Sequence, residues 1–154
     1  MKSIRFDLLA AARFLLAASL LAFAAHASAQ KPLAYKSATL KVGGHALKVE
    51  VASTDDQRMQ GLMYREKLGA DDGMLFIFDE PAYQAMWMKN TLIPLSVAFL
   101  DAQGTILSIH DMEPQTLDTH MSAGPSVYAI ETNKGWFAAK KLKAGDKVTG
   151  LPKR

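Results

Sequence analysis

The chain has 154 residues, a formal net charge of +3 at pH 7 and no cysteine. The lack of cysteine excludes disulfides, thiolate catalysis and cysteine-ligated metal centres. Three basic residues and one acidic residue lie in the N-terminal segment, residues 1–29, so the rest of the chain carries a net charge of +1. No basic stripe remains there that would indicate a nucleic-acid partner.

The N-terminal segment has the three regions of a secretory signal peptide. Lys2, Arg5 and Arg13 are followed by an apolar run over 14–25 and by Ala27-Ser28-Ala29. This order predicts a cleavable signal peptide over residues 1–29 and a single mature domain over 30–154, exported to the periplasm or secreted. The apolar run is shorter than the roughly 20 residues of a spanning helix. We therefore expect no stable membrane span after cleavage, and a retained anchor is the alternative.

Period-two patterns predict strands through most of the mature chain. The first two, 37–42 and 45–51, flank Gly43-Gly44, which is typical of a two-residue hairpin turn. The segment 74–78 is apolar without alternation, which predicts a strand covered on both faces. Further strands are predicted over 82–89, 95–101, 105–112, 126–132 and 147–151, the last of which should close the sheet.

Two short helices are predicted between these strands. A capping residue and acidic side chains at 53–56 open the first, which contains Gly61. Its apolar stripe consists of Met59, Leu62 and Met63. The second covers roughly 135–142. The predicted fold is mainly β with two short helices (α+β), a compact, closed or partly closed antiparallel β-barrel or sandwich.

Several motifs, in this order, resemble the family called domain of unknown function 192. They are MQGLMYR (59–65), GMLFIF (73–78), WMKNTLIPL (87–95), MEP (112–114), GWF (135–137) and AGD (144–146). The resemblance implies a small, often exported, β-rich domain of no established activity. The family commonly has an aspartate where this chain has Ser96, and often a cysteine in the region where it has His120 and Met121.

The segment Trp87-Met88-Lys89-Asn90 is the first candidate site. We hypothesise that Lys89 and Asn90 lie at the mouth of a cleft with Trp87 as an aromatic wall, and that Arg65 adds a second cation. The structural alternatives are a lysine stem shielded by a buried Trp87, an asparagine that bonds its own turn, and a surface arginine.

Acidic and soft-ligand side chains near residues 110–121 give two further hypotheses. Asp111 and Glu113, with His110, are candidates for an acid-base pair or for ligand contacts. His110, Met112, His120 and Met121 are candidates for a copper site, because imidazole and thioether suit soft copper. The other methionines, at 59, 63, 74, 86 and 88, lie mostly in apolar runs and are expected to fill the core.

The leading hypothesis is a non-catalytic envelope domain without a cofactor. It would bind a small polar or anionic ligand, or an envelope protein, through Arg65, Trp87, Lys89, Asn90, Asp111 and Glu113. An enzyme of unknown type and a copper-binding protein are the alternatives. The enzyme ranks below the binding domain because no nucleophile, base and orienting group can be named together.

Overall fold

The computed structural model describes residues 33–153. The predicted signal peptide, 1–29, lies outside this range. Within 33–153 there is no helix with the length and apolar character needed to cross a membrane. The prediction of a mainly β domain with two short helices is confirmed.

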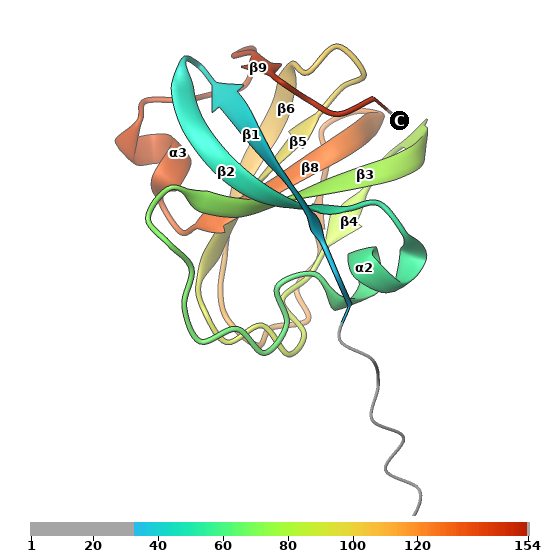
Figure 1. The fold of residues 1–154 in the computed structure, drawn as a ribbon, viewed down its shortest axis with the longest axis vertical. Coiled ribbons are helices and arrows are strands. Elements are labelled where there is room, and N and C mark those ends of the chain that lie inside the picture. Colours follow the sequence, from blue (N-terminus) through green and yellow to red (C-terminus); the bar gives the residue numbers. More distant parts are fainter. Residues whose placement is uncertain (1–32, 154) are drawn as a thin grey trace, which may run out of the picture. The chain divides into compact units, whose positions relative to one another are not determined.

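A seven-stranded sheet with the order β6-β5-β8-β3-β2-β1-β9 forms the body of the domain. Its strands curl into a half-barrel that does not close (Figure 1). The strands of this sheet are β1 (Lys36–Val42), β2 (His45–Ala52), β3 (Asp72–Ala82), β5 (Leu95–Leu100), β6 (Ile106–Met112), β8 (Ser126–Asn133) and β9 (Val148–Thr149). The prediction that 147–151 closes the sheet is wrong. β9 pairs with β1, and on its other side the Val148 N–H donates to the Gly104 carbonyl at 2.8 Å, next to a bridge between Thr105 and Lys147.

The hairpin of β1 and β2 has the predicted turn, whereas one neighbouring pair is not antiparallel. Val42 pairs with His45, and both glycines between them have positive φ, as a two-residue turn of this kind requires. β2 and β3 pair in parallel. Parallel strands need a crossover connection, and the chain from Ala52 to Asp72 supplies it with the helix α2 (Asp55–Gln60).

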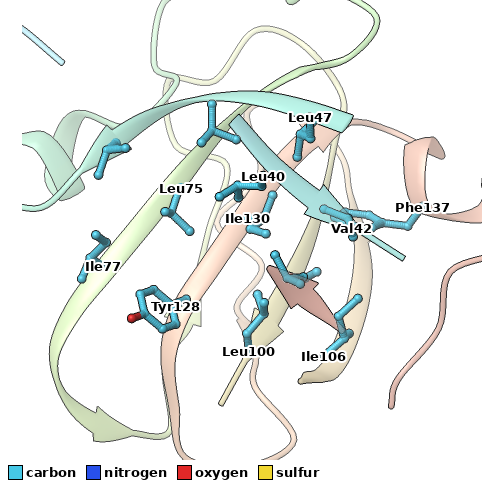
Figure 2. Packing of buried hydrophobic residues seen from close by; sticks show 14 of the residues in the cluster. Leu40, Val42, Leu47, Leu75, Ile77, Leu100, Ile106, Tyr128, Ile130 and Phe137 are labelled. Atoms are coloured by element: carbon cyan, nitrogen blue, oxygen red, sulfur yellow. The ribbon is translucent and has the colours of Figure 1, made fainter. Parts of the chain in front are cut away.

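Alternating side chains of the central strands form two apolar clusters on opposite faces of the sheet. In β3, Leu75 and Ile77 belong to the first cluster, and Met74 and Phe76 to the second. The prediction that 74–78 is covered on both faces is therefore confirmed. Figure 2 shows the first cluster, in which side chains from β1, β2, β3, β5, β6 and β8 meet Phe137 of α3 (Trp136–Ala139).

The strand predicted over 82–89 is mostly wrong. Within it only Ala82, the last residue of β3, and β4 (Ala85–Met86) are extended and paired. The partner of β4 is β7 (His120–Met121), in a separate two-stranded sheet. The chain then turns, because the Met88 N–H donates to the Thr116 carbonyl at 3.2 Å and Asn90 adopts a left-handed φ of 57°. The second helix is also shorter than predicted.

Candidate functional site

A pocket of about 540 Å³ lies between α2, the segment 84–91 and the sheet face of the second cluster. This volume is typical of small-molecule sites. Its thioethers come from Met59, Met63 and Met86. Its aromatic rings come from Phe76, Phe78 and Trp87. Its charged or titratable side chains are Asp55, Arg58 and Glu131.

The first wall of the pocket is α2 and the turn that follows it. Thr54 and Gln57 form a reciprocal capping box that fixes the start of the helix, as the residues at 53–56 predicted. The helix ends at Gln60 because Gly61 has a φ of 48°, so the prediction that Gly61 lies inside the helix is wrong. A Cβ on Gly61 would lie 3.2 Å from Phe76 Cζ. Glycine therefore lets this turn pack directly on the pocket floor.

The second wall is the segment 84–91, which is tied to its neighbours through the backbone. Gln84 and Ser122 exchange two hydrogen bonds of 2.9 and 3.0 Å, one of them through the serine hydroxyl. At the other end, the Tyr64 N–H donates to the Asn90 carbonyl at 2.9 Å. The Tyr64–Asn90 bond joins the two walls, and the Gln84–Ser122 bonds hold the second wall from another part of the chain.

Glu131 of β8 lies at the floor of this pocket and is 4% exposed. By strand alternation it shares its face with Ala129, and hence with the second apolar cluster. Among residues 33–153 its carboxyl group has no hydrogen-bond or ion-pair partner. Burial raises the pKa of Glu131 to about 8, so the carboxyl group is mostly protonated and neutral at pH 7.

Arg58 lines the rim, and both terminal nitrogens of its guanidinium have partners. Its Nη1 donates to the carbonyls of Ser53 and Ile77 at 2.9 and 2.8 Å. Its Nη2 pairs with Asp55 and, at 3.0 Å, with Asp79. Two carboxylates and two carbonyl groups therefore surround one guanidinium.

Three of the predicted ligand residues lie at or beside this pocket. Trp87 lines it and is 45% exposed, so the expectation of a buried core indole is wrong. The chain leaves β4 just before Trp87, and the next residue, Met88, enters the core instead. Lys89 Nζ lies 5.5 Å from the Trp87 ring centroid, and the Asn90 amide contacts Met63 Sδ at 4.0 Å.

Arg65 lies elsewhere, in a smaller hollow of about 130 Å³. Its guanidinium forms a two-pronged ion pair with Glu50, with Nη1 3.1 Å from Oε1. The hydrogen bond from Arg65 to Glu50 raises the pKa of Arg65 above its usual value. Arg65 is therefore matched by a carboxylate of β2 and does not line the larger pocket.

Asp111 and Glu113 also lie outside the lining of the larger pocket. Asp111 accepts a hydrogen bond from the hydroxyl of buried Ser96, which in turn accepts from the Gly135 N–H at 2.8 Å. Glu113 pairs with Lys134, and this bond raises the pKa of Lys134. Both carboxylates thus have side-chain partners elsewhere in the fold.

The proposed copper ligands are partly brought together. The His110 and His120 ring centroids are 5.9 Å apart, and the buried His110 Nε2 has no hydrogen-bond partner among residues 33–153. Met112 is fully buried, whereas Met121 is 53% exposed and alternates away from His120. The residue directly opposite His120 is Met86.

The sequence analysis did not identify Glu131, the central residue of the pocket, or Met59, which lines it. Glu131 is the one charged residue of the strand Ser126–Asn133, which was the available signal. The expectation that the methionines fill the core holds for Met74 and Met88, which are fully buried. It is wrong for Met59, which is 69% exposed and lines the pocket.

The comparisons with known proteins bear on the whole of this domain. Residues 38–150 match the family DUF192, described as "Uncharacterized ACR". The chain belongs to the DUF192 family. No curated protein matches it.

Two solved structures share this DUF192 fold. A candidate transcription regulator from Sinorhizobium meliloti 1021 is 36% identical, with a TM-score of 0.75 over 78% of this chain and 98% of its own. A protein of unknown function from Novosphingobium aromaticivorans DSM 12444 is 31% identical, with a TM-score of 0.72 over 77% of this chain and 89% of its own. The family expected from the motifs is thus confirmed.

Proposed function

We propose that this DUF192 domain is a non-catalytic binding module that holds a small molecule in the Glu131 pocket. The observation that carries the proposal is a buried carboxyl group, without a partner among residues 33–153, in a cavity with mostly apolar walls. Buried polar groups are normally hydrogen-bonded, so a ligand that supplies the missing partner would gain affinity from it. Trp87 and the thioethers supply apolar contact area.

We also propose that the protein binds its ligand outside the cytoplasm. The residues at 1–29 have the pattern of an export signal, which supports action in the periplasm or outside the cell. An envelope protein as the partner remains an alternative to a small molecule. It is favoured by the exposed apolar side chains beside the pocket, among them Tyr83 and Trp87.

A ligand screen with a blocked pocket tests the proposal. Ala85 is exposed and lines the pocket, so Ala85→Trp should fill its mouth, whereas Ala46→Trp places the same bulk on an exposed position of β2. A ligand present at 100 times its Kd stabilises the folded protein by about 2.7 kcal/mol. We expect thermal shifts of several degrees with the wild type and Ala46→Trp, and none with Ala85→Trp. Equal shifts in all three proteins would place binding elsewhere.

The proximity of His110 and His120 favours copper binding as a second candidate function. Within 33–153 no group of three or more His, Asp or Glu side chains can hold a metal ion. Two imidazoles with the thioether of Met86 or Met112 would instead suit soft Cu⁺.

We expect the wild type to compete for Cu⁺ with a chromophoric chelator, and His120→Ala to lose at least tenfold in affinity. His45→Ala, which changes an exposed histidine in β2, serves as the control. Equal affinities of the two variants would contradict a site at the His110–His120 pair.

A further inference from the structure

We propose that the ligand of the Glu131 pocket is an organic ammonium ion, with an apolar body and a primary or secondary amine that binds the Glu131 carboxylate. This inference rests on the proposed function and names the chemical class that the pocket selects. Three features of the structure carry it: the charge at the rim, the chemistry of the walls, and the lack of a cation positioned to pair with Glu131 among residues 33–153.

The charge at the rim disfavours an anion. Arg58 is the cation that lines the pocket, and its guanidinium is already shared by Asp55 and Asp79 and by two carbonyl groups. A bound carboxylate or phosphate would have to compete with these partners for the guanidinium. A cation needs no such exchange, and the exposed Asp55 carboxylate lies at the entrance.

The walls are of the kind that accommodates a cation with an apolar body. Trp87 contributes an aromatic ring to the wall, and the Lys89 ammonium lies 5.5 Å from its centroid. The sulfur atoms of Met59, Met63 and Met86 are polarisable and line the same space. A neutral or cationic ligand can therefore bury apolar surface here while its amine reaches the floor.

The neighbouring strands, all within residues 33–153, also provide no cation for Glu131. Directly paired residues share one face of a sheet, so His110, Val97, Glu131, Met74 and Glu50 form one row across β6, β5, β8, β3 and β2. The apolar Val97 and Met74 separate Glu131 from His110 and from Glu50. Glu50 is itself paired with Arg65.

Binding in this form moves one proton. The neutral Glu131 carboxylic acid loses its proton to the solvent, and the resulting carboxylate accepts N–H hydrogen bonds from the ammonium, which stays protonated. Because burial holds the pKa of Glu131 at about 8, binding at pH 7 should release about 0.9 proton per ligand. A ligand that only accepts a hydrogen bond from the neutral acid would release none.

The experiment compares three probes of similar shape: 2-phenylethylammonium, 2-phenylethanol and phenylacetate. Calorimetric titrations of the purified protein at pH 7 in two buffers of different ionisation enthalpy measure affinity and proton release together. We expect the ammonium to bind at least tenfold more tightly than the alcohol or the acid. Its affinity should rise nearly tenfold from pH 6 to pH 7 and level off above pH 8.

Two variants isolate the role of Glu131. Glu131→Gln should remove the preference for the ammonium, its pH dependence and the proton release, while binding of 2-phenylethanol persists and reports an intact pocket. Asp55→Asn removes an exposed carboxylate at the rim. It should weaken ammonium binding by less than about threefold at moderate salt and keep both the pH dependence and the proton release.

The outcomes separate the two proposals. If the alcohol or phenylacetate binds as tightly as the ammonium, or if the ammonium binds without releasing a proton, the ligand class is wrong and the pocket remains a binding site. Failure of all three probes to bind the wild type overturns the ammonium class. A different result contradicts the proposed function: the ligands found by screening bind Ala85→Trp as well as they bind the wild type.

Discussion

Glu131→Gln is expected to stabilise the protein at pH 8 by roughly 3–5 kcal/mol, and to change its stability little at pH 4.5. A glutamate exposed to water has a pKa of 4.5, and burial raises the pKa of Glu131 in the fold to about 8. Each unit of difference corresponds to about 1.4 kcal/mol. A buried glutamine is similar in size to the neutral acid and does not titrate.

The sign of this effect follows from the proton counts of the two states. Below the unfolded pKa both states hold the proton, and Glu131 costs the wild type no stability through ionisation. As the pH rises, the unfolded chain ionises while the fold keeps Glu131 neutral, so the free energy of unfolding falls. Above the folded pKa both states are ionised and this loss is complete. The wild type should therefore lose stability relative to Glu131→Gln between about pH 4.5 and 8.

Urea unfolding of both proteins at pH 4.5, 6, 7 and 8 measures this difference. Glu80→Gln, at an exposed position of β3, is the matched control and should follow the wild type at every pH. Parallel curves for the wild type and Glu131→Gln would show that the folded protein holds Glu131 ionised, with a partner or water. In that case the neutral carboxyl group would not exist.

Phe137→Ala should cost about 3–5 kcal/mol, whereas Trp87→Ala should cost about 1 kcal/mol or less. Phe137 is 1% exposed, belongs to the first apolar cluster, and meets Trp136 edge-to-face with centroids 5.2 Å apart. Its removal leaves a cavity in a packed core. Trp87 is half exposed and loses mainly a contact with Lys89 that is worth about 0.5–1 kcal/mol.

Denaturant unfolding of the two variants at pH 7 provides the measurement, and each variant is the control for the other. The pair matters because the sequence pattern predicts a buried Trp87. A loss near 3 kcal/mol in Trp87→Ala would mean that the indole is covered in solution and that the pocket is closed there.

Much of the sheet could be predicted because its signals are local. The glycine pair at the β1–β2 turn, the alternation in β1 and β2, and the unbroken apolar run of β3 each determine a strand by themselves. The parallel pairing of β2 and β3 has no such signal, because it depends on the packing of the connection between them. The error over 82–89 is of the same kind. The pattern allows a strand there, and contacts with Thr116 and Tyr64 impose a turn.

The candidate site was predicted only in part for a related reason. Trp87, Lys89 and Asn90 stand out as polar and aromatic residues beside a proline, and the structure places them at or beside the pocket. Glu131 alone in a strand looks like one outward-facing residue. Its burial is imposed by α2 and by the segment 84–91, which cover that face of the sheet from distant parts of the sequence. No local sequence pattern indicates that distant segments will bury one face of this strand.

The crossover between β2 and β3 has a consequence for how such domains can diversify. Because these strands run in the same direction, the chain must travel over the sheet to join them, and here that passage supplies Asp55 to Met63 along the cavity. Substitutions in this passage can alter which compound is accepted while the strand register stays the same. One connection can thus evolve selectivity separately from the scaffold that keeps the protein folded.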